Sequence, residues 1–427
     1  MNRSFEKSNK MLGRALEIIP TASQTFSKSH LQYPKGHAPM FIERGLGSRV
    51  WDVDGNEYID MVNGLMAVSL GYNDPDVNRA VMEQLSKGIC FSLPSELEYE
   101  LAQLLVEIIP CAEMVRFGKN GSDATSAAIR LSRAYTGRDK VAVCGYHGWQ
   151  DWYIGSTARH LGVPQPVRAL TQTVPYNDLE ALENILKTET YAAFILEPMN
   201  VELPRPGYLE GIRKLTESTG TVLVFDEIVT GFHYALGGAQ EYFGVTPDLS
   251  SFGKGMGNGM PIGAIVGKKE IMKLQDDIFF SGTFGGEALS LAASIAAIKK
   301  MKREPVIKQL WSFGGRLSAA VEKVIAANGL GDVLSLKGLD PWKVLSFSGR
   351  GDVSAMAVRT FIQKEMIAQG VLLLSSHNMS YAFTEGDHVA VVSAYEKTLD
   401  ALASGLKRGT LVAEMGCPVI EPIFKVR

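Results

Sequence analysis

Short, continuously apolar runs that alternate with helical patterns place the strongest limit on how this chain can fold. The alternation begins near residue 114 and ends near residue 303. Strands that are apolar on both faces are typical of a parallel sheet with helices on each side. The expected strands are residues 115–117, 141–144, 192–196, 222–225 and 264–266, and the expected helices are residues 124–135, 179–186 and 288–303, with another inside 206–218. The sequence therefore predicts an α/β fold around a largely parallel sheet.

The length of the chain favours more than one domain. The 427 residues exceed the roughly 250–300 residues that one hydrophobic core usually supports. Residues 40–60 read as strand, turn and strand around the turn signal at Asp54 and Gly55, and helical and strand patterns mix beyond residue 305. We expect an N-terminal segment (1–60) that joins a small α+β domain (305–427), and a large domain (61–304).

Composition argues against several classes of function. The formal net charge of −3 gives no reason to expect nucleic acid or an acidic membrane as partner. No stretch approaches the roughly 18 apolar residues of a membrane span, and the N-terminus lacks the apolar core of a signal peptide. The four cysteines lie far apart, without metal-ligand spacing, which indicates reduced thiols. We expect a soluble, cytoplasmic protein with no metal site.

An amine and a carboxylate stand out within the alternating region. Lys254 lies in the run SFGKGMGNGM, where glycines allow the backbone to approach a bound group closely. Asp226 ends an apolar run, so it should lie at the carboxyl end of a strand, where open α/β sheets bind ligands. Pyridoxal phosphate chemistry requires such a pair, since the amine forms a Schiff base and the carboxylate keeps the pyridine nitrogen protonated. The alternative is an ordinary surface lysine after an ordinary strand.

Two nearby segments offer further contacts for such a cofactor. The turn at Gly121 and Ser122 feeds a helix, whose free N–H groups and dipole favour a phosphate. Capping of the helix by Ser122 or Asp123 explains this turn equally well. Tyr146 follows a buried strand in an aromatic-rich run, so its ring can lie flat on a planar cofactor, with His147 beside it. Local packing is the alternative for these aromatic residues.

Two more residues fit the same site. Glu197 follows an apolar strand, and a carboxylate in that position is either structural or part of a ligand site. The run SGTFGGE at residues 281–287 places the hydroxyl of Thr283 and several glycines ahead of a helix. This is a second loop that is compatible with a phosphate.

Four motifs appear in order and together resemble those of the class III aminotransferases of fold type I. They are DEIVTGF at 226–232, LGGAQ at 236–240, GVTPDL at 244–249 and the segment around Lys254. The resemblance covers about residues 37–405 and is strongest to the glutamate-1-semialdehyde 2,1-aminomutase-like branch. It implies a large pyridoxal-phosphate-binding domain with a mostly parallel, seven-stranded sheet, and a small α+β domain.

The resemblance implies roles for the residues around the cofactor ring. Lys254 would carry the Schiff base, and Asp226 would pair with the pyridine nitrogen. Ile228 would pack under the ring, and Tyr146 would stack on its opposite face.

It also implies how the phosphate is bound. Gly121 and Ser122 would hold it, and Thr283 would reach the phosphate of the neighbouring subunit, which implies a homodimer. Glu197 and His147 would be secondary residues of the site.

The chain departs from the family pattern mainly where substrate is recognised. The usual phosphate turn SGTE reads NGSD at 120–123, which is chemically similar. The usual TGFR ends in His233, the branch's SPVR reads TFSK at 25–28, and its QFE segment reads HNM at 377–379. The last three changes argue against a true glutamate-1-semialdehyde aminomutase.

We therefore expect an enzyme that moves an amino group from an amino-acid donor, such as glutamate, to a sugar, aldehyde or ketone. Lys254 would transfer a proton between substrate and cofactor as general acid and base. Alternatives are an intramolecular aminomutase, a racemase or epimerase, and a scaffold that binds without catalysis. The expected partners are small molecules and a second copy of the chain.

Overall fold

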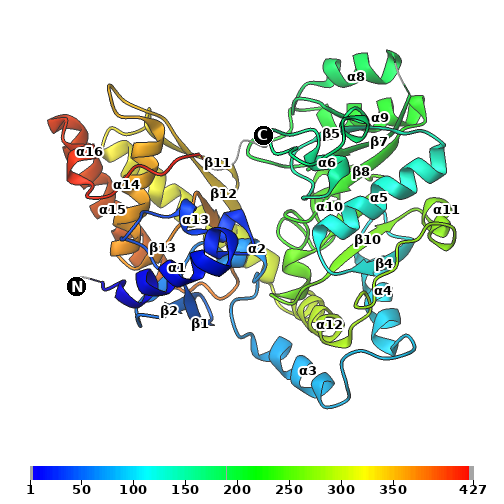
Figure 1. Ribbon diagram of the computed structural model, residues 1–427, viewed down its shortest axis with the longest axis horizontal. Helices are drawn as coiled ribbons and strands as arrows, with labels where there is room; N and C mark the ends of the chain where they lie inside the picture. Colours follow the sequence, from blue (N-terminus) through cyan, green and yellow to red (C-terminus); the bar gives the residue numbers. More distant parts are fainter. Residues whose placement is uncertain (1–2, 189, 423–427) are drawn as a thin grey trace. The chain divides into compact units, whose positions relative to one another are not determined.

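The computed structural model describes residues 3–188 and 190–422. Contacts between residues divide the described chain into two compact units, one that runs from Pro75 to Ile307 and one that combines residues 3–74 with residues 308–422 (Figure 1). The domain limits expected from the sequence, at residues 60 and 304, stay a prediction.

Within its described residues, the larger unit contains a seven-stranded sheet with the order β4-β10-β9-β8-β7-β5-β6. The strands are β4 (Met114–Gly118), β5 (Lys140–Cys144), β6 (Thr171–Thr173), β7 (Tyr191–Leu196), β8 (Val222–Asp226), β9 (Leu249–Phe252) and β10 (Gly263–Gly267). Only β10 runs against its described neighbours, β4 and β9. The expected α/β fold with a mostly parallel, seven-stranded sheet is confirmed.

Helices cover both faces of this sheet because its central strands are apolar on both sides. Alternate residues of β8, Val222 and Val224, pack with α5 residues, while Leu223 and Phe225 pack with α8 and α9 residues. Figure 1 shows α5 on one side of the strands and α8 and α9 on the other. The helices are α3 (Pro75–Leu85), α4 (Glu96–Ile108), α5 (Gly121–Thr136), α6 (Asp151–Ile154), α7 (Gln165–Arg168), α8 (Leu179–Thr188), α9 (Tyr208–Thr219), α10 (Ala239–Phe243), α11 (Lys269–Met272) and α12 (Ala288–Arg303).

Several candidate residues follow strands at one edge of this sheet. Asp226 is the last residue of β8, Glu197 comes directly after β7, and Lys254 comes two residues after β9. These three strands are parallel neighbours. Their carboxyl ends therefore meet at the same edge, as the sequence predicted.

The smaller unit combines segments from both ends of the sequence. In its described part, β3 (Glu57–Asp60) pairs in parallel with β13 (Val371–Leu372) in the sheet β1-β2-β3-β13, and a second sheet has the order β11-β12-β14. The remaining strands are β1 (Ile42–Leu46), β2 (Arg49–Asp52), β11 (Leu334–Leu339), β12 (Trp342–Phe347) and β14 (Ser376–Asn378). The helices are α1 (Glu6–Ile18), α2 (Asn63–Met66), α13 (Val306–Ala327), α14 (Ala355–Ala368), α15 (Glu385–Arg408) and α16 (Leu411–Glu414).

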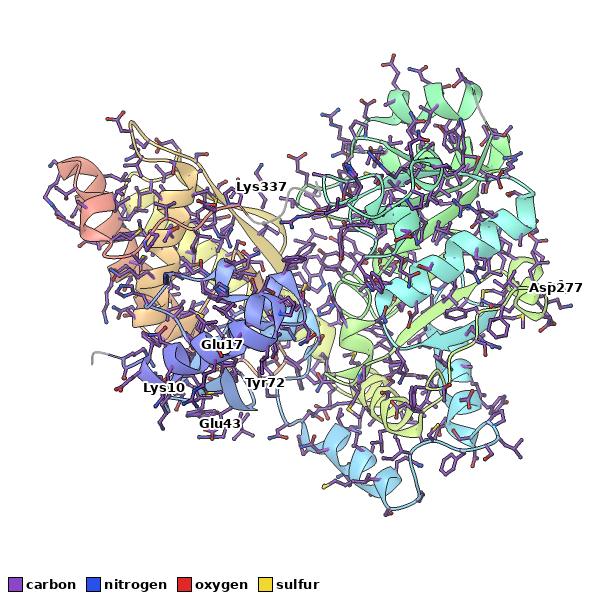
Figure 2. All side chains as sticks on the ribbon, in the orientation of Figure 1. Lys10, Glu17, Glu43, Tyr72, Asp277 and Lys337 are labelled. Carbon is purple, nitrogen blue, oxygen red and sulfur yellow. The ribbon has the colours of Figure 1, made fainter. Side chains whose placement is uncertain are left out.

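The smaller unit has exposed polar side chains on α1 and a buried, hydrogen-bonded carboxylate at Asp60. Lys10 and Glu17 of α1 are exposed, whereas Tyr72 donates a hydrogen bond of 2.6 Å to the buried carboxylate of Asp60 (Figure 2). Asp60 also accepts from the backbone N–H of Val62, so both carboxylate oxygens have a partner. Across residues 3–188 and 190–422, no helix combines the length and the hydropathy needed to cross a membrane.

His377 is a buried histidine on β14. Its side chain is 0% exposed, and its Nε2 lies 2.6 Å from the hydroxyl of Tyr395. Burial lowers the pKa of His377 to about 4, and the nearby ammonium of Lys343 adds to this effect. The residue occupies the segment where the aminomutase branch has QFE, but its ring faces the interior of the smaller unit.

We predict that His377 makes the smaller unit less stable in acid. An unfolded histidine takes up a proton as the pH falls below 6.5, whereas folded His377 does so only near pH 4, so the folded state loses stability as the pH falls between these values. Between pH 7 and 5 the H377Q variant should lose about 2 kcal/mol less stability than the wild type. Thermal or denaturant unfolding at both pH values measures the difference.

The Y395F variant is the control because it keeps the imidazole buried and removes only the hydroxyl. It should retain the pH dependence of the wild type. Equal losses of stability in H377Q and in the wild type would contradict the prediction.

Candidate functional site

Asp226 and His147 form a buried pair at the carboxyl end of β8. The Nδ1 of His147 lies 2.8 Å from Oδ2 of Asp226, and the side chain of His147 is 2% exposed. The other oxygen of Asp226 accepts from the backbone N–H of Ile228. His147 therefore fixes the orientation of the Asp226 carboxylate.

Tyr146 and Glu197 meet beside this pair. The backbone N–H of Tyr146 donates to Oε2 of Glu197 at 3.0 Å, and the side chain of Asn200 donates to the same oxygen. Burial raises the pKa of the Tyr146 phenol, and the carboxylates of Asp226 and Glu197 raise it further. Tyr146 is nevertheless 38% exposed, so part of its ring is open for a contact.

The start of α5 is capped by Asn120, not by Ser122. The side chain of Asn120 accepts from the backbone N–H of Asp123, and the Asp123 carboxylate accepts from the backbone N–H of Asn120 and Lys119. The Asp123 carboxylate therefore points back toward the residues that precede the helix. Ser122 is left in the first turn of the helix, where backbone N–H groups have no acceptor within the helix.

Gly121 allows the start of α5 to approach Ile228 closely. A Cβ atom at Gly121 would lie 3.0 Å from Cδ1 of Ile228 and 3.1 Å from its Cγ1. Ile228 follows Asp226 by two residues, so this contact ties the N-terminus of the helix to the end of β8. A side chain at residue 121 would push the two apart.

Lys254 begins a short 3-10 helix, Lys254–Gly257, directly beyond β9. Its φ of 42° lies in the left-handed region, which residues other than glycine seldom adopt. Such conformations cluster at functional sites, where the surrounding structure enforces them.

Two further residues beside this site were not among the residues predicted from the sequence. Glu227 is fully buried, and its carboxylate accepts from the hydroxyl of Thr230 and from the backbone N–H groups of Ala239 and Gln240. Ser251 is the register partner of Asp226 on β9, and its buried hydroxyl has no hydrogen-bond partner within the described part of the chain. The adjacent acidic pair DE was the only available signal for Glu227.

Thr283 lies on an exposed loop, away from the contacts of Asp226. Its carbonyl oxygen accepts a weak hydrogen bond from Cys90, with 3.8 Å between sulfur and oxygen. The loop lines a cavity of about 340 Å³ together with Lys119, which precedes α5, and with Asp123 and Ser126 in the first turns of that helix. The structure thus brings Asp226, His147, Tyr146, Glu197, Gly121 and Ile228 into contact in pairs, but places Thr283 apart.

Comparison with known proteins identifies the family. Residues 32–386 match the family model "Aminotransferase class-III". The chain belongs to the class III aminotransferases. It is 36% identical over 406 residues to the 3-aminobutyryl-CoA aminotransferase of Cloacimonas acidaminovorans, with 92% of this chain and 96% of the relative covered. It is 37% identical over 431 residues to the glutamate-1-semialdehyde 2,1-aminomutase of Natranaerobius thermophilus, with 93% and 99% covered.

A solved structure agrees with this assignment. The pyridoxal phosphate internal aldimine form of the Sphingopyxis sp. MTA144 FumI protein has a TM-score of 0.87 at 28% identity, with 94% of this chain and 98% of that chain covered. The chain is therefore a pyridoxal-phosphate-dependent aminotransferase of fold type I, which acts on small-molecule amino donors and acceptors. The predicted family, fold, enzyme class and cofactor are confirmed.

We predict that the buried Asp226 depends on the N–H donor of His147. The H147F variant keeps an aromatic ring but leaves Oδ2 of Asp226 without its partner, which should cost about 1–3 kcal/mol of folding stability. The H147N variant retains an N–H group close to the position of Nδ1 and should lose clearly less. Denaturant unfolding of the cofactor-free proteins compares the two, and a loss in H147N as large as or larger than that in H147F would contradict the prediction.

Proposed function

We propose that this enzyme transfers an amino group from an amino-acid donor, such as glutamate, to a separate carbonyl acceptor such as a sugar, aldehyde or ketone. The observation that carries the proposal is the arrangement at the sheet edge, where Lys254 and the buried carboxylate of Asp226 follow the adjacent parallel strands β9 and β8. This arrangement supplies an amine and a carboxylate to the same ligand.

The residues at this edge fit pyridoxal phosphate. The first turn of α5, with Gly121 and Ser122, offers N–H groups and a helix dipole to a phosphate. Asp226 offers a carboxylate that His147 already orients, to hold a proton on the ring nitrogen. The buried hydroxyl of Ser251, on the neighbouring strand, is a further donor without a described partner.

Two side chains would enclose the ring. Ile228 packs against the start of α5 and would lie under one face. The partly exposed ring of Tyr146 would cover the other face. Glu197 would act indirectly, since it accepts from the backbone of Tyr146 and so fixes the position of that residue.

Lys254 performs the proton transfers in this proposal. Bound pyridoxal phosphate withdraws electrons from the substrate carbon that carries the amino group. Lys254 would hold the cofactor through its side-chain amine, and the same amine would remove the proton from that carbon and return it elsewhere as general base and acid. Asp226 would pair with the protonated ring nitrogen.

The segments that face the substrate in the aminomutase branch have different sequences here, and these differences favour transfer between two molecules. The branch's SPVR and QFE segments read TFSK and HNM here, and His377 of the latter turns toward Tyr395. A relative named 3-aminobutyryl-CoA aminotransferase supports transfer between two substrates. A relative named glutamate-1-semialdehyde 2,1-aminomutase supports the alternative, an intramolecular aminomutase.

We also infer a cytoplasmic location, because all four cysteines are free thiols.

We predict that K254A binds the cofactor without the visible Schiff-base absorbance and transfers no amino group at a useful rate. Loss of the general acid and base alone costs roughly 10²–10⁴-fold in rate. Glutamate added to the wild type should change the absorbance, and a carbonyl acceptor should restore it. The K273A variant, which removes an exposed lysine, should behave like the wild type.

The same assay separates the two functions. Consumption of an amino-aldehyde by the wild type without any donor would favour the aminomutase. Full turnover by K254A would exclude Lys254 from the chemistry.

We further propose a homodimer in which Thr283 binds the phosphate in the partner's site. The support is its position on an exposed loop, where a second copy of the chain can reach its hydroxyl. Exposed aromatic side chains flank the loop, with Phe279 at 83% and Phe284 at 59% exposure, and a second copy would cover them.

We predict that T283A weakens cofactor binding by roughly 10–100-fold, the effect of losing about 1.5–3 kcal/mol for a hydrogen bond to a charged group. T283S keeps the hydroxyl and should bind almost normally. Mixing T283A with K254A creates mixed dimers with one complete site, so the visible absorbance should return at cofactor concentrations that leave T283A empty. Absence of recovery in proven mixed dimers would place Thr283 outside the partner's site.

A further inference from the structure

Hydroxyl side chains on one face of α5 contact the loop that follows β5. Ser122, Thr125 and Ser126 have the i, i+3, i+4 spacing that places side chains on the same side of a helix. The loop runs from His147 to Gln150, between β5 and α6. Thr125 donates to the carbonyl oxygen of His147, and Ser126 donates to the side chain of Gln150. Side-chain hydrogen bonds therefore attach the loop to the helix.

Thr125 donates its hydroxyl proton to this loop and not to its own helix. Its side chain is 1% exposed, and its hydroxyl lies 2.8 Å from the carbonyl oxygen of His147 but 3.3 Å from that of Ser122. A hydroxyl has a single proton to donate, so the shorter contact takes it. Ser132, also on α5, instead donates to the carbonyl of Ala128 at 2.7 Å, as hydroxyl groups inside helices commonly do.

His147 is fixed by this contact at its backbone and by two others at its ring. Its Nδ1 lies 2.8 Å from Oδ2 of Asp226, and its Nε2 lies 3.2 Å from the carbonyl oxygen of Cys144. A loop that moved away from α5 would carry the imidazole away from the carboxylate. Thr125 therefore acts on Asp226 through His147.

The same loop also lies against the hydroxyl of Ser122. Gly148 has a φ of 109°, and a Cβ atom there would lie 2.3 Å from the Oγ of Ser122, so only glycine allows this approach. The backbone nitrogen of Trp149 lies 3.4 Å from the same oxygen and donates to it. Ser122 thus accepts from the loop and can donate its own proton to a phosphate at the start of α5.

We propose that Thr125 is a positioning residue of the cofactor site. Its hydroxyl holds residues 147–149 against α5, so that the carboxylate of Asp226 and the hydroxyl of Ser122 keep a fixed separation. The inference rests on the cofactor contacts proposed for these two residues. Groups that bind opposite ends of one ligand bind it best when their spacing is set in advance, because ordering them on binding costs affinity.

The test is the affinity of the T125V variant for pyridoxal phosphate. Valine keeps the shape of the side chain and removes the hydroxyl, so the dissociation constant should rise about 10-fold, the effect of one lost hydrogen bond. T125S restores the hydroxyl and should regain most of the affinity. S132A removes a buried hydroxyl that donates within α5, and its dissociation constant should stay within about twofold of the wild type. If T125V does not fold, T125A removes the same group.

Two fragments of the cofactor distinguish the positioning role from a local one. Pyridoxal lacks the phosphate and reports on the end near Asp226, whereas inorganic phosphate, measured by competition with pyridoxal phosphate, reports on the end near Ser122. T125V should bind both fragments more weakly than the wild type, because the loop contacts both ends. Weaker binding of one fragment alone would overturn the inference.

A further readout does not need the cofactor. In the cofactor-free protein, the backbone N–H groups of residues 147–150 should exchange with deuterium faster in T125V than in the wild type, T125S or S132A. Equal exchange in T125V and the wild type would overturn the inference, as would equal losses of affinity in T125V and T125S. Failure of the wild type to bind pyridoxal phosphate would instead refute the proposed function, and the exchange rates would still judge Thr125.

Discussion

Two adjacent carboxylates at the end of β8 determine the geometry of this site. Successive residues of an extended chain point to opposite faces, so Asp226 and Glu227 diverge. Asp226 turns toward His147, and Glu227 turns toward the hydroxyl of Thr230 and the backbone N–H groups of Ala239 and Gln240. One carboxylate is thus held by His147 while the other fixes the following loop. Burial raises the pKa of Glu227, and the donated hydrogen bonds oppose that rise. Removal of those donors would leave a buried charge without partners, which is strongly destabilising.

The N-terminus of α5 is positioned by the same strand end. Ile228 comes directly after the acidic pair and contacts Gly121 at the start of α5. The free N–H groups of that helix are therefore held near Asp226. Asp123 would repel a phosphate if its carboxylate faced outward, but it accepts from the backbone N–H of Lys119 and Asn120 instead. The capping arrangement satisfies the turn and leaves the positive end of the helix dipole for an anion.

The sequence predicted the parts of this structure that depend on long apolar runs, and it missed those that depend on polar contacts. Residues 192–196 and 222–225 match β7 and β8 because buried strands contain nothing but apolar residues there. The edge strand β6 reads Thr-Gln-Thr, and β9 contains Ser250 and Ser251, so neither has an apolar pattern. The sequence also did not predict that Asn120 caps α5 or that His147 contacts the carboxylate of Asp226. Their positions depend on side-chain hydrogen bonds between segments that are distant in sequence, which periodicity does not encode.

Strain at Lys254 connects the fold to its chemistry. A left-handed conformation costs roughly 1–2 kcal/mol for a residue other than glycine, and Lys254 adopts it at φ 42° although a glycine stands on either side. Lys254 could adopt a less strained backbone conformation only if β9 moved. That strand is hydrogen-bonded to β8 on one side and to β10 on the other. The strain is therefore sustained by the sheet. For the role proposed for Lys254, a backbone that does not move with the side chain is an advantage, because the amine then returns to the same place in every turnover.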